Sequence, residues 1–397
     1  MGPMAPEPSV AAPTLDVDWL RGRRWFRSKA RQLTSVDTFD VASIDPTSSL
    51  LVLAARFADG PDEHYLVPAA QDDGGLREPR DGDGTWRALV ARLAAGPASI
   101  AARNGSFELH PTPALGTFLA NPADPALAER AFSVEQSNTS VRIGDAAVLK
   151  IYRLLEPGIN PEVEIGEFLT AHGFAHAPSL GGHIAYRFSG GEAAAAAMVQ
   201  QLVPSRGDGW DWALRHLAGG GDPNQTLAGL SQVGGLTAEL HATLASEPAN
   251  ADFPSRPATA EEGAAWLAAA NAQLDEALGT VRGEERERLA GVERDIRRAL
   301  QPLADAAGTP VSRIHGDYHL GQLLRTAHGF AILDFEGEPA RPLAERRRPS
   351  SPLRDVAGML RSIDYAGRTA QRQAQASLDA DAWVADARRA FLNAYGL

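Results

Sequence analysis

Residues 313–339 constrain the fold of this chain more than any other stretch; their sequence is RIHGDYHLGQLLRTAHGFAILDFEGEP. Two short segments in it place His, Asp, Gln and Glu side chains around glycines. The apolar run FAIL between them is typical of a buried strand. One strand–loop–strand unit therefore carries several groups that can hold a metal ion or move a proton.

The spacing inside this stretch matches the needs of phosphoryl transfer. A kinase uses a carboxylate to orient the attacking hydroxyl, an amide five residues later to bind metal, and a second aspartate on the next strand to bridge the phosphates through Mg²⁺. Asp317 in HGD is followed five residues later by Gln322, and Asp334 opens DFEG after the strand. We therefore predict Asp317 as the catalytic base and Gln322 and Asp334 as Mg²⁺ ligands, with glutamine in place of the usual asparagine.

A lysine and a glutamate upstream supply the other charges that a kinase requires. Lys150 lies in a strand-like run, and the helix predicted over 159–174 follows it, with Asn160 as N-cap. The lysine would neutralise the α- and β-phosphates of ATP, and a helix glutamate would hold it. Glu164 and Glu162 compete for that role. We favour Glu164, because Phe168 four residues later puts it at the edge of the buried face.

Two further segments are expected to contact the nucleotide. The loop EQSNTSVRIGD, residues 135–145, precedes the lysine and would cover the phosphates with backbone N–H groups and with Ser137, Asn138 and Thr139. It lacks a GxGxxG pattern and is a weak signal by itself. The segment QQLV, residues 200–203, would form the hinge between lobes. Its predicted adenine-binding residues are Gln200, Gln201 and Val203.

The chain divides into three parts behind a disordered tail at residues 1–14. Residues 15–120 form an α+β module, with a hairpin predicted at 49–70. Residues 121–204 form a small sheet-rich lobe with one helix, and its alanine-rich run at 193–203 is interpreted as a strand. Residues 205–397 are helical and contain the 313–339 stretch. The order predicts an α+β, bilobal kinase-like fold with an additional N-terminal domain.

Composition excludes several classes of function. Of 397 residues, 44% are hydrophobic, and the net charge of −12 argues against nucleic acid as the main partner. There is no cysteine, so disulfides and thiolate metal sites are excluded. The first residues lack the basic and apolar regions of a signal peptide, and no apolar run has the length of a spanning helix. We expect a soluble, cytoplasmic protein without membrane partners, and a monomer by default.

The motifs HGDYHLGQ, DFEGEP and SPLRDVAGMLRS resemble the maltokinase branch of the aminoglycoside-phosphotransferase-like kinases. The early RRWFRSKAR is similar to the start of that branch's N-terminal cap domain. The resemblance implies a cap domain over 15–120, an intermediate nucleotide-binding lobe, a helical C-terminal lobe, ATP, Mg²⁺ and a free sugar as acceptor. The branch includes glucosamine kinases, which we favour here. Maltose is the second choice, followed by an aminoglycoside, and then a non-catalytic pseudokinase.

The acceptor is expected beside Asp317. Acidic residues there would suit an ammonium-bearing sugar by charge complementarity. The predicted substrate-binding set is Asp317, His319, Glu336, Glu338 and Arg341. For Glu336, a second metal contact, the sugar and plain solvent exposure all stay open. The run Arg346–Arg348 reads as a solvated charged face, and Asp355 as a structural brace of the catalytic loop.

Overall fold

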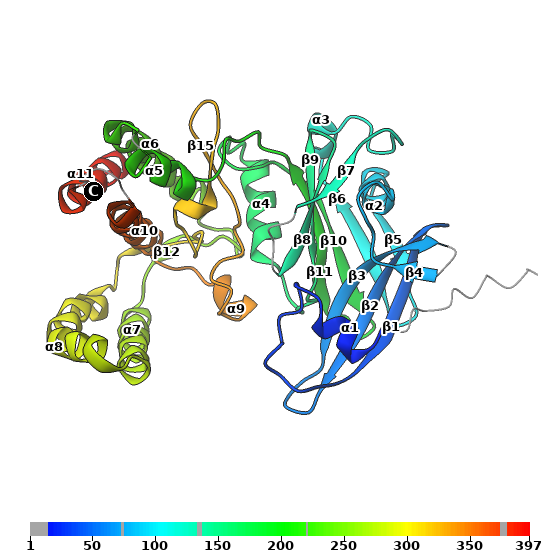
Figure 1. The fold of residues 1–397 in the computed structure, drawn as a ribbon, viewed down its shortest axis with the longest axis horizontal. Helices are drawn as coiled ribbons and strands as arrows, with labels where there is room; N and C mark the ends of the chain where they lie inside the picture. Colours follow the sequence, from blue (N-terminus) through cyan, green and yellow to red (C-terminus); the bar gives the residue numbers. More distant parts are fainter. Residues whose placement is uncertain (1–14, 73–74, 133–136, 220, 374–378) are drawn as a thin grey trace, which may run out of the picture.

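A computed structural model describes residues 15–72, 75–132, 137–219, 221–373 and 379–397. The tail predicted at residues 1–14 lies outside these ranges. From the N-terminus the chain forms a small sheet domain, a larger sheet and a helical part, in that order (Figure 1). The predicted α+β arrangement is therefore observed. Within the described ranges, the helices are too short or too polar to cross a bilayer.

The N-terminal domain is a four-stranded antiparallel sheet in the order β1-β2-β3-β4. Its elements are α1 (Val17–Arg21), β1 (Leu33–Asp45), β2 (Ser48–Phe57), β3 (Glu63–Asp72), β4 (Gly75–Arg77) and α2 (Thr85–Ala94). The hairpin predicted at 49–70 is β2 and β3. Strand β2 is buried on both faces, because Leu51 and Leu53 pack under Trp25 and Phe26, whereas Leu50 faces α2 and the second sheet.

The second sheet has seven strands in the order β5-β6-β10-β11-β9-β8-β7. Its elements are β5 (Ala98–Ala101), β6 (Gly105–Pro111), α3 (Leu115–Phe118), β7 (Glu129–Ala131), β8 (Asn138–Ile143), β9 (Ala147–Tyr152), α4 (Pro161–Ala171), β10 (Leu180–Phe188) and β11 (Ala193–Gln201). The predicted domain boundary at residue 120 does not separate the two sheets. Strands β5 and β6 belong to the second sheet, because β6 pairs with β10.

The alanine-rich run forms strand β11, as predicted. It pairs with β10 on one side and β9 on the other, so it lies at the centre of the sheet. Ala194 and Ala196 are fully buried where the cap domain packs closely. Small side chains at these positions let the two sheets approach closely. This packing outweighs the intrinsic helix propensity of alanine.

The C-terminal lobe is helical, with three long helices around one core. Its elements are α5 (Gly209–Leu217), α6 (Pro223–Leu244), β12 (Arg256–Pro257), α7 (Ala260–Thr280), α8 (Gly283–Leu300), η1 (Gln301–Asp305), β13 (Pro310–Val311), η2 (Leu320–Gln322), β14 (Leu323–Arg325), β15 (Phe330–Ile332), α9 (Leu343–Arg346), α10 (Leu353–Gln373) and α11 (Ala380–Tyr395). Helices α6, α10 and α11 bury Leu230, Met359 and Phe391 between them. Helices α7 and α8 project from this body (Figure 1).

Helix α4 stands between the seven-stranded sheet and the helical lobe (Figure 1). Asn160 caps it and Pro161 occupies its first turn, as the sequence predicted. Ile165 and Phe168 join the core of the helical lobe, whereas Val163 packs against Tyr152 of the sheet. The helix is therefore packed on both lobes at once, and its position relative to each determines the geometry between them.

Candidate active site

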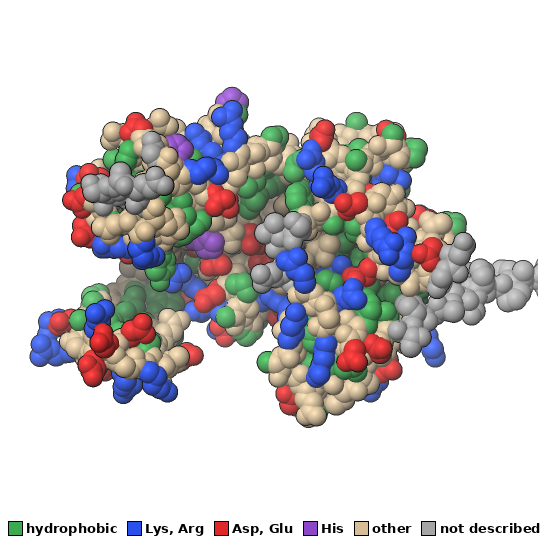
Figure 2. Space-filling model, viewed as in Figure 1, with side chains coloured by type: hydrophobic (Ala, Val, Ile, Leu, Met, Phe, Trp, Pro, Cys, Tyr) green, Lys and Arg blue, Asp and Glu red, His purple; other side chains and the backbone are tan. Residues whose placement is uncertain are grey.

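Lys150 is the centre of the charged cluster between the lobes. Its ammonium nitrogen lies 2.8 Å from Glu162 Oε2, 3.1 Å from Asp334 Oδ1 and 2.7 Å from Glu336 Oε1. Burial by itself would lower the pKa of Lys150, but the three carboxylates outweigh it and raise that pKa well above its ordinary value. Acidic side chains are visible between the helical lobe and the sheets (Figure 2). One buried cation thus joins α4 to the segment after β15.

Glu162, rather than the predicted Glu164, holds this lysine. Glu162 also accepts a hydrogen bond from Tyr152 Oη at 2.7 Å, and burial raises the pKa of its carboxyl despite the neighbouring ammonium. Two residues apart on a helix means about 200° of rotation, so the two glutamates face opposite sides. Phe168 does lie on the side of Glu164, but that side faces the helical lobe and not the sheet.

Asp334 occupies an unusual backbone position. Its φ of 63° makes it the one non-glycine residue with positive φ in the described part of the chain. Such conformations gather at functional sites, because the surrounding structure must hold them in place. Gln322 Nε2 donates to Asp334 Oδ2 at 3.2 Å. Burial would raise the pKa of Asp334, but Lys150 outweighs this and lowers it.

These groups fit a hard divalent cation. Oxygens of Glu162, Asp334 and Glu336 lie within 4.8 Å of one another. Gln322 lies beside Asp334 with its amide nitrogen toward that carboxylate, so the amide would have to turn for its oxygen to bind a cation. Carboxylate and amide oxygens are the ligands that Mg²⁺ prefers. Glu336 also accepts from Asn138 Nδ2 at 2.9 Å, so this carboxylate touches the predicted phosphate loop.

Asp355 on α10 binds the backbone of the HGD segment, residues 315–317, which we call the catalytic loop. Its carboxylate accepts from the backbone N–H groups of His315 at 2.8 Å and Gly316 at 2.9 Å, and from His241 Nε2 at 3.1 Å. His315 Nε2 in turn lies 2.9 Å from the carbonyl oxygen of Leu333, the residue before Asp334. The predicted bracing position of Asp355 is therefore observed, and the two motif segments are joined through His315.

Asp317 lies at the open side of this loop. Its side chain is 32% exposed, and His319 Nε2 stands 4.0 Å from its Oδ2. His319 is the N-cap of the short helix η2, and its Nδ1 accepts from the N–H of Gly321. Gly316 has a φ of +85°, and a Cβ there would lie 3.3 Å from the Cα of Gly337. The HGD and DFEG segments thus touch through their glycines.

The predicted nucleotide-contacting residues border this cluster. Ser137 and Asn138 stand at the start of β8, and Thr139 Oγ1 accepts from Arg153 Nε at 2.9 Å. Residues 133–136, which include the first two of the predicted loop, lie outside the described residues. At the end of β11 lies a small cavity of about 10 Å³ beside Asp334; its lining includes Glu162, Leu180, Met198, Gln200, Leu333, Asp334 and Phe335.

Two backbone N–H groups of the segment 200–203 already donate hydrogen bonds within the protein. The N–H of Gln201 donates to Ser179 O at 2.9 Å, and the N–H of Leu202 donates to Ala146 O at 2.8 Å. An adenine edge would therefore be read by other backbone groups here, including those of Val203.

Glu338 and Arg341 pair with each other. Arg341 Nε donates to Glu338 Oε2 at 2.7 Å, and Arg354 Nη2 donates to the same oxygen at 2.8 Å. The hydrogen bond from Arg341 lowers the pKa of the Glu338 carboxyl. Two arginines neutralise Glu338, which weakens the prediction that this carboxylate attracts an ammonium-bearing sugar by charge. Glu336 shares the single Lys150 ammonium with Glu162 and Asp334 and is not neutralised by it.

Arg346 and Arg347 are not part of the solvated face that we predicted for the run Arg346–Arg348, whereas Arg348 is exposed. The Arg346 side chain is 5% exposed and lies 3.6 Å from Glu156, and Arg347 forms a bidentate pair with Glu164. Arg313, which sequence reasoning did not single out, is 1% exposed and bonds the same glutamate. The sequence feature that could have pointed to Arg313 is its position two residues before His315 in the 313–339 stretch.

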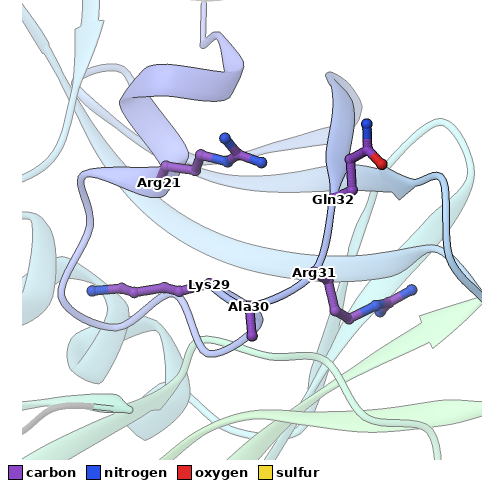
Figure 3. Close-up of a pocket in the computed structure, with 5 residues that line it drawn as sticks. All are labelled: Arg21, Lys29, Ala30, Arg31 and Gln32. Carbon is purple, nitrogen blue, oxygen red and sulfur yellow. The ribbon is translucent and has the colours of Figure 1, made fainter.

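A separate hollow of about 490 Å³ lies on the N-terminal domain, lined by Arg21, Lys29, Ala30, Arg31 and Gln32. Lys29 and Arg31 point in opposite directions there (Figure 3), and Arg31 is already paired with Glu63 at 2.7 Å. The hollow contains none of the carboxylates described above. The candidate active site is therefore the cluster around Lys150, Asp317 and Asp334.

Comparison with known proteins identifies the family of this chain. A model of the phosphotransferase enzyme family matches residues 129–391, and a model of the maltokinase N-terminal cap domain matches residues 19–99. The glucosamine kinase of Streptacidiphilus jiangxiensis is 36% identical over 89% of this chain and 78% of that protein. The glucosamine kinase of Mycolicibacterium smegmatis is 31% identical over 83% of this chain and 82% of that protein.

A solved structure of a glucosamine kinase in complex with glucosamine, ADP and inorganic phosphate is also similar, with 32% identity and a TM-score of 0.74. The match covers 99% of this chain and 87% of that one. These likenesses confirm the predicted bilobal fold with an N-terminal cap domain and a hydroxyl group as the acceptor. The chain belongs to the phosphotransferase enzyme family and carries the cap domain of the maltokinases.

Proposed function

We propose that this protein is a glucosamine kinase, which transfers the γ-phosphoryl group of ATP to glucosamine and forms glucosamine 6-phosphate. The observation that carries the proposal is the likeness, over nearly the whole chain, to a glucosamine kinase whose structure holds glucosamine, ADP and phosphate. Two curated glucosamine kinases at 36% and 31% identity support the same acceptor. Charge complementarity at Glu338 does not support it, because two arginines already pair with that carboxylate.

In this proposal Asp317 acts on the acceptor. Its partly exposed carboxylate orients the sugar hydroxyl and accepts the hydroxyl proton as the new P–O bond forms and ADP leaves. A modest basicity is enough, because the proton leaves late in a loose transition state. His319, 4.0 Å away, would border the same acceptor.

The nucleotide would lie on the other side of the cluster. Lys150, held by Glu162, would meet the α- and β-phosphates, and Asn138 with its neighbours Ser137 and Thr139 would cover them. Adenine would contact the 200–203 backbone beside Gln200, where the cavity of about 10 Å³ would have to widen to admit it. Mg²⁺ held by Asp334 and Gln322, with Glu336 nearby, would neutralise the charge that develops on the phosphates. A cytoplasmic location, where ATP is available, and action as a monomer belong to the same proposal.

Maltose is the second candidate acceptor, because the cap-domain family that matches residues 19–99 is named for maltokinases. The test is ADP release from Mg²⁺·ATP with separate panels of glucosamine, glucose, maltose and an aminoglycoside. Selective turnover of glucosamine is expected. Preferential turnover of maltose would move the protein to the maltokinases. Turnover with none of them, by a protein that binds ADP, would contradict the proposed activity.

A further inference from the structure

Glu164 sits in a buried ion cluster on the side of α4 that faces away from Lys150. It accepts from Arg313 Nη1 at 2.6 Å, from Arg347 Nε at 3.0 Å and from Arg347 Nη2 at 2.5 Å. The turn at Asp252 closes the cluster, with its carbonyl oxygen 3.0 Å from Arg313 Nη1 and its carboxylate 3.1 Å from Arg347 Nη2. We call Glu164, Arg313, Arg347 and Asp252 the α4 clamp.

The α4 clamp joins three segments whose relative positions the proposed reaction requires to be fixed. Glu164 belongs to α4, two residues from the glutamate that holds Lys150. Arg313 lies four residues before Asp317, and Arg347 follows the segment that carries Asp334 and Glu336. The clamp therefore connects the helix that places the lysine with both segments that carry the acidic groups around it.

Packing reinforces the clamp on the same side of the helix. The guanidinium of Arg313 lies 5.0 Å from the ring centre of Phe253, and that ring stacks on Phe168 of α4 at 3.9 Å. Glu164 and Phe168 are four residues apart, so both point from one face of α4 into the helical lobe. Bidentate guanidinium–carboxylate pairs fix orientation as well as distance, which loose apolar contacts do not.

We propose that the α4 clamp is a positioning device for the phosphotransfer reaction, in which Arg347 acts through Glu164 and α4 to hold Glu162 and Lys150 over Asp334. The inference rests on the proposed kinase activity. If the α4 clamp is broken and α4 shifts, Glu162 moves with the helix. Lys150 then keeps only Asp334 and Glu336 as partners. The nucleotide phosphates would then meet a displaced cation, while the acceptor side around Asp317 stays in place.

Arg347→Met is the variant that tests this. Its side chain is 26% exposed, and Arg313 still neutralises Glu164 after the change, so the chain is expected to fold. Glu164→Gln is less suitable, because it leaves the Arg313 guanidinium buried without an anion. Arg256→Met serves as the matched control, because it removes a bidentate pair with Glu262, which is not part of the α4 clamp.

We expect Arg347→Met to lower kcat and weaken Mg²⁺·ADP binding by about three- to thirtyfold each, with the KM for glucosamine unchanged. Arg347→Lys should recover only part of this, because it restores the charge without the bidentate geometry. Arg256→Met should keep the wild-type values. A loss of thermal stability in Arg347→Met with unchanged kcat and ADP affinity would overturn the proposal.

A double-mutant cycle with Glu162→Gln separates positioning from independent binding. If Arg347 acts through Glu162, the double variant binds ADP no more weakly than Glu162→Gln alone. Effects that multiply would contradict the proposal. Because ADP binding needs no acceptor, this readout stands even if the wild-type protein fails to phosphorylate glucosamine, so the two failures are distinguishable.

The lysine content offers a direct spectroscopic readout. The chain has two lysines, Lys29 and Lys150. Selective ¹⁵N-lysine labelling therefore gives two side-chain signals, and Lys29→Met assigns them. We expect Arg347→Met to shift the Lys150 signal and leave that of Lys29, which is exposed on the cap domain, in place. An unmoved Lys150 signal would show that the clamp does not reach the lysine.

Discussion

At the scale of single residues, Lys150 is the group on which the site depends. Three carboxylates surround its ammonium, with Glu336 at 2.7 Å. The same three carboxylates have oxygens close enough together to hold a metal ion. In the nucleotide-free protein the ammonium thus supplies the positive charge that these acids require, and a divalent cation has to compete with it.

Lys150→Met removes this internal cation. We expect the variant to bind Mn²⁺ without nucleotide about tenfold or more tightly than the wild type, because three neighbouring carboxylates are left without a counter-charge. Electron paramagnetic resonance of free Mn²⁺ measures this directly, and Lys29→Met is the control. Unchanged Mn²⁺ affinity would show that the carboxylates do not act together on a cation.

Asp317→Asn separates chemistry from binding. The side chain is partly exposed and pairs only loosely, with His319 at 4.0 Å, so the change should leave ADP affinity within about twofold of the wild type. Turnover should fall by about a hundredfold or more, because the amide cannot accept the hydroxyl proton. Calorimetry and ADP release measure the two effects. Turnover near the wild-type rate would remove Asp317 from the role of base.

At the scale of secondary-structure elements, motif spacing predicted which segments lie together, whereas the side of α4 that faces Lys150 was predicted wrongly. Asp317, Gln322 and Asp334 are close in sequence, so a short loop and a β-hairpin bring them together with little help from the rest of the fold. Glu162 and Glu164 differ only in which side of α4 they occupy. Both sides of α4 are packed, so periodicity could not tell the sheet side from the helical-lobe side.

The element that holds the catalytic loop is α10, through Asp355. Burial would raise the pKa of this carboxyl, but the hydrogen bonds from His241 and the loop backbone outweigh it and lower the pKa. Because the pKa of Asp355 is lower in the folded than in the unfolded protein, its ionised carboxylate stabilises the fold at pH values above the unfolded pKa of about 4. This stabilisation is lost as the pH falls through the folded-state pKa.

Asp355→Asn should therefore destabilise the protein by about 3 kcal/mol or more at pH 7, because a buried anion with three hydrogen bonds is lost. The difference from the wild type should shrink as the pH drops below about 4, where the wild-type carboxyl also loses its advantage. Urea unfolding at a series of pH values measures both. A difference independent of pH would mean that the charge of Asp355 does not matter.

At the scale of the whole molecule, the cap domain is tied to the strand that carries Lys150. Arg153, just after β9, lies 4.7 Å from the ring centre of Trp25, 3.3 Å from Glu78 and 2.9 Å from Thr139 Oγ1. The backbone N–H of Leu66 donates to the carbonyl oxygen of Arg153 at 2.7 Å. The sequence predicted a cap domain, but it could not predict that β5 and β6 cross into the second sheet, because β-pairing over such separations leaves little local signal.

Arg153→Met tests this connection. Burial lowers the pKa of Arg153 to about 10, so the guanidinium stays charged at pH 7, and its loss leaves Glu78 with Arg23 as a cationic partner. We expect a destabilisation of about 2–4 kcal/mol and weaker ADP binding, because Thr139 loses its hydrogen bond. Arg56→Met, at an exposed pair with Asp37 in the cap, is the control. Unchanged stability would contradict the described packing.

The proposed reaction passes a phosphoryl group from ATP to a hydroxyl of glucosamine. The most direct measurement is ³¹P and ¹H NMR of the product formed from Mg²⁺·ATP and glucosamine by the wild type and by Asp317→Asn. The account predicts ADP and glucosamine 6-phosphate with the wild type and neither with the variant. A product phosphorylated elsewhere would contradict the proposed 6-hydroxyl acceptor, and ADP with free phosphate but no sugar ester would contradict the account as a whole.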